Sequence, residues 1–300
     1  MRRSAVMDTA LALNLAFGEP PTAIHPVVWF GRLATLLERR ARRTTPAAEL
    51  SSGVVLVLLT LLVAWQVARQ AERLAASGGR RLAQTATPRP GPQRSALLAT
   101  AATLLVEGWL MKTMLPLRGL TAAAEAVQQA LDHDDLPAAR TALHSLVSRD
   151  VAALDGPLLA AATIESLAEN AGDSLVAPTL AYLAFGLPGA ALYRGINTLD
   201  AMFGYRGVNE WFGKAAARLD DAANLVPARL TACLLSVAGS FNGRAKATWR
   251  MARRDHQQTA SPNAGWPMSA MAGALGVELE KIGNYRLGAP AAVRRHWNGY

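Results

Sequence analysis

The stretch Gly53–Ala68, GVVLVLLTLLVAWQVA, carries no charged residue and decides the fold class. Its length comes close to the roughly 20 apolar residues that a helix needs to span the hydrocarbon of a bilayer. Arginines gather on both sides of it, in ERRARR over residues 38–43 and at four positions between residues 69 and 81. Because arginines beside apolar runs are typical of the cytoplasmic side of a membrane, the stretch predicts a transmembrane helix.

The overall composition agrees with a membrane protein. The chain has 300 residues, is 51% hydrophobic and has a net charge of +9. A basic chain can bind nucleic acid, but here the arginines lie beside apolar runs, so we expect a lipid bilayer as partner and no nucleic acid. The single cysteine, Cys233, excludes a disulfide framework and a cysteine metal site, and its apolar neighbours predict a buried thiol.

Three further apolar runs suggest more than one span: Ser95–Leu115, Ser174–Tyr193 and Ala222–Phe241. The second is broken by Pro178 and by GLPG at residues 186–189, which predicts either a kinked span or two half-helices that enter and leave on the same side. The chain is therefore predicted to be an all-α, multi-span helical membrane protein with broken or re-entrant helices.

The segments between these runs predict soluble structure. Residues 118–162 have the pattern of a helical hairpin, with Asp135 and Asp155 as N-caps. Residues 77–94 are rich in Gly, Pro and Arg and predict an exposed loop. The tail, residues 242–300, is basic and loop-rich, with a helix predicted over MSAMAGALGVELEKI. We expect one membrane-embedded domain over residues 1–300.

An acidic block stands out in this basic chain. Residues 140–221 carry six basic and nine acidic side chains, a net charge of −3. Within it, Glu165, Glu169 and Asp173 recur at i, i+4 and i+8 and share one face of a helix. Like charges at this spacing oppose the helix, so a positive group should face them. Magnesium favours such oxygen ligands, and a solvated face neutralised by local arginines is the alternative.

Other polar residues lie close to this block in sequence. Asn197 and Asp200 share a helix face, and Asp220 and Asp221 form a second oxygen-rich cluster. Several arginines suit phosphate oxygens, although ordinary ion pairing is the alternative for each of them. The short signatures of nucleotide-binding loops, zinc proteases and nucleophile elbows are absent from the sequence.

Two ionisable residues outside the block are further candidates. His25 precedes Pro26, which biases it towards an extended conformation at the mouth of the next helix. A structural histidine is the alternative to a catalytic one. Glu107 lies inside an apolar run, where ionisable residues usually face a bundle interior or cavity.

A set of short motifs is spread along nearly the whole chain: HPV at 25–27 with GR at 31–32, VE at 106–107, DL at 135–136, RD at 149–150, ESLAEN at 165–170 with Asp173, YR at 193–194, NTLD at 197–200, GY at 204–205, ARLDD at 217–221, Asn224, PARL at 227–230 and NAGWP at 263–267. With these motifs the chain resembles the adenosylcobinamide-phosphate synthase family of cobalamin-biosynthesis membrane proteins. Asn14, Val151 and Ala201 depart from the family pattern.

The resemblance implies ATP-dependent amide formation between adenosylcobyric acid, a corrinoid substrate, and (R)-1-amino-2-propanol or its O-phosphate. It implies ATP and Mg²⁺ as cofactors, a bacterial cytoplasmic (inner) membrane location with the active site facing the cytoplasm, and it allows a homo-oligomer. On this basis the predicted catalytic residues are His25, Glu107 and Glu169; the substrate- or phosphate-binding residues are Arg140, Arg149, Arg194, Asn197, Tyr205, Arg206, Lys214, Arg218 and Asn263; the metal ligands are Glu165, Glu169, Asp173, Asp200, Asp220 and Asp221.

Two other classes of protein fit parts of the pattern. Helices broken by Pro and Gly that carry carboxylates also occur in small transporters and channels. A soluble all-helical protein with an unusually apolar interior is the second alternative.

Overall fold

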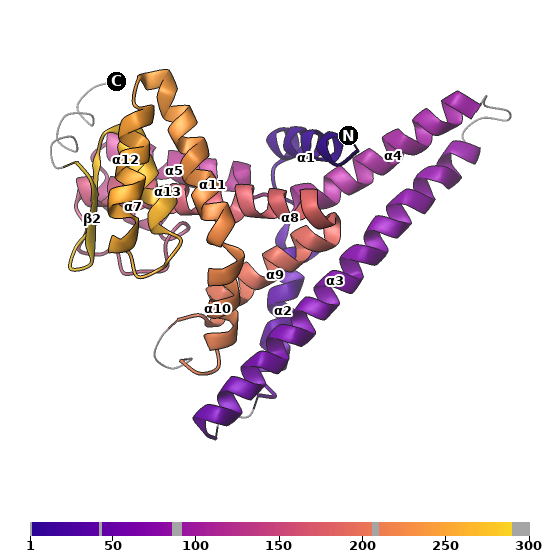
Figure 1. Ribbon diagram of the computed structural model, residues 1–300, viewed down its shortest axis with the longest axis horizontal. Helices are drawn as coiled ribbons and strands as arrows, with labels where there is room; N and C mark the ends of the chain where they lie inside the picture. Colours follow the sequence, from indigo (N-terminus) through magenta and orange to yellow (C-terminus); the bar gives the residue numbers. More distant parts are fainter. Residues whose placement is uncertain (1, 42–43, 86–91, 206–209, 290–300) are drawn as a thin grey trace. The chain divides into compact units, whose positions relative to one another are not determined.

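The computed structural model describes residues 2–41, 44–85, 92–205 and 210–289 (Figure 1). Within these residues, nearly all regular structure is helical, and a single two-stranded antiparallel sheet is the exception. The all-α prediction is therefore correct apart from that sheet. The chain divides into two compact units. The first is Met1–Leu117 with Pro178–Ala222, and the second is Arg118–Ala177 with Ala223–Tyr300. That the two units act as one domain stays a prediction.

The first unit is built around two long helices, α3 and α4, which pack against each other. A Cβ at Gly79 of α3 would lie 2.5 Å from the Thr103 hydroxyl of α4, so only glycine permits this approach. The loop predicted over residues 77–94 is wrong at both ends, because packing keeps these segments helical. The elements are α1 (Arg2–Phe17), η1 (Thr22–Ile24), α2 (Pro26–Glu38), α3 (Pro46–Thr85), α4 (Pro92–Lys112), α8 (Ala177–Phe185), α9 (Leu187–Phe203) and α10 (Lys214–Ala223).

The second unit contains shorter helices and the small sheet. Asp135 and Asp155 accept hydrogen bonds from Ala138 N–H at 2.9 Å and Leu158 N–H at 3.0 Å, so both predicted N-caps are confirmed. The helix after Asp135 is shorter than predicted and ends at Leu143. The elements are α5 (Leu117–Asp132), α6 (Leu136–Leu143), α7 (Gly156–Asn170), the π-helical η2 (Ala171–Val176), α11 (Leu225–Ala238), η3 (Gly239–Asn242), α12 (Ala245–Asp255), η4 (His256–Gln258), α13 (Gly265–Leu275), β1 (Glu278–Lys281) and β2 (Tyr285–Gly288).

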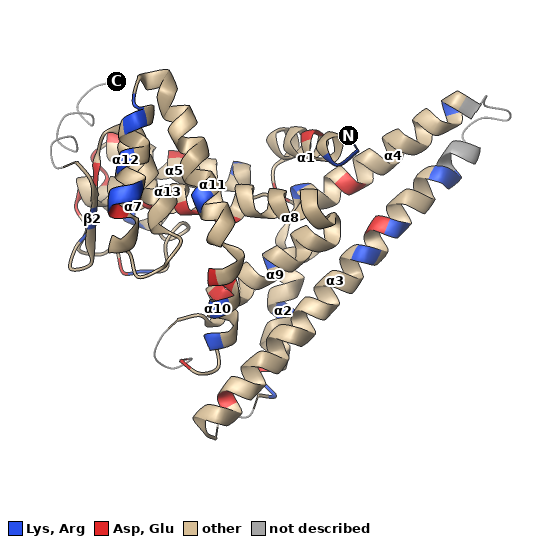
Figure 2. Cartoon of the chain, in the orientation of Figure 1, with Lys and Arg blue, Asp and Glu red and all other residues tan. Residues whose placement is uncertain are grey.

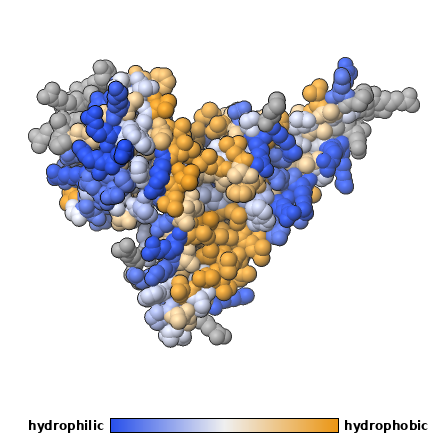
Figure 3. Space-filling view, viewed as in Figure 1, coloured by the Kyte–Doolittle hydropathy of each residue, from blue (hydrophilic) through white to orange (hydrophobic). Residues whose placement is uncertain are grey.

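Two helical stretches among the described residues are long and apolar enough to cross a membrane, Pro46–Arg81 and Leu225–Asn242. A third becomes possible only if Gln93–Lys112 and Leu117–Asp132 form one bent span. Figure 2 shows that the middle of α3 carries no charge, and Figure 3 shows apolar side chains gathered there. Only 28% of the most apolar window of α3 is buried, which leaves most of it available to lipid. Two or three such helices are compatible with a membrane protein.

The span predicted over residues 174–193 and the predicted burial of Cys233 have different outcomes. The break at residues 186–189 is confirmed, because Gly186 takes φ +73° between α8 and α9. Neither helix is among the candidate spans of the described residues, and a re-entrant arrangement stays a prediction. The prediction of a buried Cys233 is wrong: the residue is exposed, since α11 presents part of its apolar surface outward.

The tail ends in a β-hairpin where a helix was predicted. Helix α13 stops at Leu275 because Gly276 takes φ +72°, and β1 then pairs with β2. Asp255 at the end of α12 holds the hairpin in place. Its buried carboxylate accepts hydrogen bonds from Gly288 N–H at 2.9 Å and from Arg254 Nε at 2.6 Å. Burial alone would raise the pKa of Asp255, but these hydrogen bonds hold it below its ordinary value.

We therefore expect Asp255→Asn to destabilise the protein by about 1.5–3 kcal/mol at neutral pH, the usual value of hydrogen bonds to a charged group. A carboxyl whose pKa is lowered by folding contributes stability above its unfolded pKa of about 3.9, and that stability is lost as the pH falls through the folded pKa. The difference from wild type should shrink below about pH 4. Thermal unfolding across pH measures this, with the exposed Asp132→Asn as control. An equal loss at all pH values would contradict it.

Candidate functional site

The clearest site in the second unit is a cavity of about 200 Å³ beside α7. We call it the α7 pocket. Glu165 and Glu169 lie one helical turn apart on α7 and both line it. Its other charged and hydroxyl-bearing walls come from the segment before α7 and from the hairpin. The polar lining residues that matter here are Arg149, Glu165, Ser166, Glu169, Lys281 and Tyr285.

Glu165 and Arg149 form the ion pair at the centre of this pocket. Arg149 Nη2 donates to Glu165 Oε2 at 3.2 Å. Glu165 is only 5% exposed, and its other oxygen, Oε1, is buried without a hydrogen bond. Nε of Arg149 is likewise buried without an acceptor. Burial raises the pKa of the Glu165 carboxyl, and the nearby charges of Arg149 and Lys281 only partly offset this.

The β-hairpin supplies the opposite wall of the α7 pocket. In a strand, alternate side chains share a face, so Lys281 and Tyr285 point the same way as the buried Leu279 and Leu287. The Lys281 ammonium lies 5.8 Å from the centre of the Tyr285 ring. Tyr285 lies near Glu165, and burial followed by the charge of Glu165 raises the pKa of its phenol. No hydrogen bond to Glu165 Oε1 is completed.

Three other predicted residues of the second unit lie elsewhere. Arg140 of α6 donates from Nε and Nη2 to the Leu154 carbonyl, at 3.2 and 2.9 Å. These hydrogen bonds hold the loop before α7 against α6. Asn263 accepts from Arg229 Nη1 at 3.0 Å. Asp173 lies in η2 and does not line the α7 pocket. The predicted shared face therefore extends only to Glu165 and Glu169, because the helix changes from α to π after Asn170.

The remaining predicted residues belong to the first unit. His25 caps α2 through Nδ1, which accepts from Val27 N–H at 3.3 Å. Burial lowers the pKa of His25, and Arg194 lowers it further against the opposing charge of Glu19. Buried Glu107 forms an ion pair with Arg2.

The helices α9 and α10 carry most of the other first-unit residues. Arg194 Nη1 donates to Asn197 Oδ1 at 3.3 Å, within α9. Lys214 Nζ lies 4.2 Å from the Trp211 ring centre, and Arg218 is 4.0 Å from Asp221. Arg206 lies outside the described residues. Asp200 is on α9, Asp220 is on α10 and Tyr205 is exposed after α9. That these residues join the α7 pocket in one site stays a prediction.

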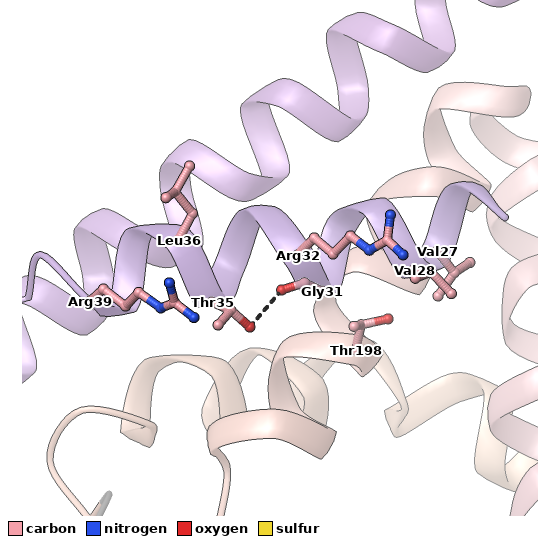
Figure 4. Close-up of a pocket in the computed structure, with 8 residues that line it drawn as sticks. All are labelled: Val27, Val28, Gly31, Arg32, Thr35, Leu36, Arg39 and Thr198. Carbon is pink, nitrogen blue, oxygen red and sulfur yellow. Dashed lines mark hydrogen bonds between the residues drawn. The ribbon is translucent and has the colours of Figure 1, made fainter. Parts of the chain in front are cut away.

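A larger groove of about 740 Å³ lies along α2 in the first unit (Figure 4). Arg32 and Arg39 line it from α2, together with apolar side chains, and Thr198 lines it from α9. Thr35 donates to the Gly31 carbonyl at 3.0 Å beside them. Two guanidinium groups beside an apolar wall suit an anionic ligand with an apolar body.

A comparison with protein families decides the assignment of the chain. The model of the family described as CobD/Cbib protein matches residues 7–298. The chain belongs to the CobD/Cbib family.

Named members of the CobD/Cbib family are similar along most of their length. The cobalamin biosynthesis protein CobD of Dehalococcoides mccartyi is 40% identical, over 93% of this chain and 84% of its own. The protein of the same name from Geobacter metallireducens is 40% identical over 96% and 84%. The probable cobalamin biosynthesis protein CobD of Methanocaldococcus jannaschii is 33% identical over 96% and 89%. No solved structure matches. The resemblance predicted from the motifs is confirmed.

Mg²⁺ was predicted for this CobD/Cbib chain at two sets of carboxylates. Across residues 2–41, 44–85, 92–205 and 210–289, no group of three or more His, Cys, Asp or Glu side chains is arranged to hold a metal ion. The described residues therefore do not fit a metal cage made by the protein alone. Mg²⁺ usually keeps waters and binds through one or two carboxylates plus substrate phosphates, so the metal assignment stays a prediction that depends on the substrate.

The sequence reasoning missed four residues that line cavities of this family member: Arg32, Arg39, Lys281 and Tyr285. Arg39 was interpreted as a membrane-flanking charge, and Arg32 was named only as part of the GR motif at residues 31–32. The only available signal for Lys281 and Tyr285 was the alternation of ELEK and YRLG around Gly283, which is too short to distinguish from a helix end.

We expect Arg149→Met to destabilise this protein by about 3 kcal/mol at neutral pH, because it leaves the buried Glu165 carboxylate unpaired. A carboxyl whose pKa is raised by folding contributes most stability below its unfolded pKa and loses it as the pH rises through the folded pKa. The loss should therefore shrink towards pH 4 and be suppressed by adding Glu165→Gln. Unfolding curves from pH 4 to 8 measure this.

Arg140→Met is the matched control for this prediction. Its guanidinium binds a backbone carbonyl and no carboxylate is paired with it in the described residues, so its loss should not vary with pH in this range. A pH-independent effect of Arg149→Met as well would show that the ion pair with Glu165 is not what stabilises the fold.

Proposed function

We propose that the protein is the amide-forming ligase of cobalamin biosynthesis that joins adenosylcobyric acid to (R)-1-amino-2-propanol or its O-phosphate, using ATP. Family membership over residues 7–298 and relatives named as cobalamin biosynthesis proteins support this proposal over a transporter or channel. The observation that carries the chemistry is the α7 pocket, where a buried carboxylate with a free oxygen lies beside an arginine.

The proposed reaction forms one amide bond between a carboxyl carbon of the corrinoid and the nitrogen of the amine donor. ATP would supply the activation: a carboxylate oxygen of the corrinoid attacks the terminal phosphorus of ATP, and ADP leaves, which gives an acyl phosphate. The donor arrives as an ammonium ion and must lose a proton before its nitrogen attacks the acyl carbon. As the carbon–nitrogen bond forms, inorganic phosphate leaves with the electron pair of its bond to that carbon.

Glu165 is our candidate for the group that accepts the proton. Its raised pKa makes it a stronger base than an ordinary carboxylate; the residue lines the α7 pocket, and its buried Oε1 accepts no hydrogen bond. Glu169, one turn along α7, supplies a second negative charge for the ammonium. Of the bases predicted from the sequence, His25 uses Nδ1 to cap α2 and Glu107 is paired with Arg2, so neither is preferred.

The proposal also covers the membrane location of the enzyme and the role of its arginines. Two or three apolar helices would hold the enzyme in the bacterial cytoplasmic membrane, and an active site that faces the cytoplasm would have access to ATP. The guanidinium groups around the two cavities would bind anionic substrate groups, as arginine forks do with carboxylate and phosphate.

The purified protein, given adenosylcobyric acid, ATP, Mg²⁺ and each amine donor in turn, should form a product whose mass equals the two substrates less one water, together with ADP and phosphate. Glu165→Gln should lower kcat by about 100-fold or more, the usual contribution of a general base. Mass spectrometry and coupled ADP detection measure both quantities.

Glu280→Gln is the matched control, because Glu280 pairs with Arg286 on the exposed face of the hairpin. It should keep the wild-type rate. Wild-type kcat in folded Glu165→Gln would remove Glu165 as the base, and absence of ATP-dependent product with both donors would refute the function itself.

A further inference from the structure

The second unit exposes a row of apolar side chains along α11, which we call the α11 stripe. Val226, Val237 and Phe241 are 69%, 65% and 90% exposed, and the last of these continues the row into η3. Because the spacing follows the period of a helix, the row lies on one face. A continuous exposed row of this kind marks a surface that meets lipid or another molecule. The stripe consists of Val226, Cys233, Leu234, Val237 and Phe241.

The neighbouring helix α12 exposes a row of cations. Lys246, Arg250 and Arg253 recur at i, i+4 and i+7, so they share one face, and all three are exposed. Within the described residues none of the three forms an ion pair, whereas Arg254 beside them is paired with Asp255. Like charges at this spacing repel each other, so the row favours a partner that brings negative charge.

The two helices run antiparallel and side by side. A Cβ at Gly239, at the end of α11, would lie 2.6 Å from the Thr248 hydroxyl, near the start of α12. Further from the turn, Ala232 of α11 and Ala252 of α12 belong to one buried cluster. Figure 3 shows hydrophobic side chains over α11 and hydrophilic ones over α12 on one face of this unit.

This packing decides how α11 can meet a membrane. Length and composition alone allow α11 to cross a bilayer. However, a crossing would carry the attached α12 into the hydrocarbon, and Arg250 in its middle would lie there without a partner. Ionisable side chains at that depth are rare and normally face a paired group or a cavity. A helix that lies in the plane of the interface, with its apolar face among the acyl chains, avoids this cost.

We propose that α11 and α12 form a docking surface for anionic phospholipid, in which the α11 stripe lies in the membrane interface and Lys246, Arg250 and Arg253 contact the headgroups. Nucleic acid would match the cations but would leave the apolar stripe exposed to water. A second copy that met this face about a two-fold axis would bring three more cations to it. An anionic bilayer surface satisfies both rows together.

The depth of α11 in a bilayer tests the proposal. Cys233 is the single cysteine and lies on the stripe, so a nitroxide label on it reports the depth of α11 directly. The full-length protein is placed in nanodiscs, and Val226→Cys and Val237→Cys in a Cys233→Ser background supply two more labels. Electron paramagnetic resonance with oxygen and a water-soluble nickel chelate should place all three labels at one shallow depth, about 5–10 Å below the headgroups.

A helix that crosses the bilayer gives a different pattern of depths. Positions 226 and 237 would then differ by about 16 Å along the axis, at a rise of about 1.5 Å per residue. That difference would overturn the proposal, and so would labels that remain in water. Line broadening between Cys233 labels that disappears on dilution with unlabelled protein would show a second copy on the stripe and would also overturn it.

The choice of lipid tests the role of the cations. The ratio of docked to undocked Cys233 label should be at least about tenfold higher in discs of equal phosphatidylglycerol and phosphatidylcholine than in phosphatidylcholine alone, since each cation near an anionic surface contributes about fivefold. The triple variant Lys246→Gln/Arg250→Gln/Arg253→Gln should remove this difference. Equal docking in both lipids, or an unchanged difference in the triple variant, would overturn the proposal.

Arg250→Lys/Arg253→Lys is the matched control, because it changes the same exposed positions and keeps their charge. Attraction to headgroups depends on charge, so this variant should keep the wild-type lipid dependence. Loss of the lipid dependence in the control as well would show that the surface does not act through its charge and would overturn the proposal. Since the readout is the position of α11, each result is independent of amide formation.

Discussion

The cost of burying charge is the constraint on which the rest of this structure depends. An apolar chain of this kind excludes water from its interior, and a charge placed there must be matched by a partner. Glu107 is matched by Arg2. The Lys112 ammonium donates to the Gly18 carbonyl at 2.9 Å and lies 3.8 Å from the Trp109 ring centre. The contacts of Glu107 with Arg2 and of Lys112 with Gly18 join α4 to α1 and to the residue that follows it, so the same contacts neutralise charge and hold the helices together.

Only one of the two carboxylate oxygens of Glu165 has a hydrogen-bond partner. This distinguishes Glu165 from buried carboxylates whose contacts are purely structural. Oε2 of Glu165 accepts a hydrogen bond from Arg149, whereas the buried Oε1 accepts none, and the residue lines the α7 pocket. By contrast, the Asp255 carboxylate accepts hydrogen bonds from Arg254, Gly288 and Gln258, and the bond from Gly288 holds the hairpin against α12. The two buried carboxyls also differ in the direction of their pKa values, raised for Glu165 and lowered for Asp255. A carboxyl with a raised pKa and an oxygen that accepts no hydrogen bond is suited to proton transfer.

Much of the fold could be predicted from local sequence, because local rules decide it. The charge-free middle of α3 follows from composition, and the caps at Asp135 and Asp155 follow from backbone donors that need acceptors. Val151, a departure from the family pattern, is buried in the core beside α7, which explains an apolar residue there. The α7 pocket was predicted only in part. Glu165, Glu169 and Arg149 were found from spacing and motif, but Lys281 and Tyr285 depend on a contact between segments far apart in sequence, which local patterns do not contain.

The register of this hairpin determines which of its side chains line the α7 pocket. A shift of one residue would turn Lys281 and Tyr285 outward and bring Glu280 and Arg286 against α7. The burial of Leu279 and Leu287 opposes that shift, because the same slip would expose both leucines. Gly283, at φ +73°, fixes the turn that sets the pairing. The apolar residues that pack the hairpin against α7 therefore also determine which charges face the cavity, and a substitution at either leucine should affect ligand recognition as well as stability.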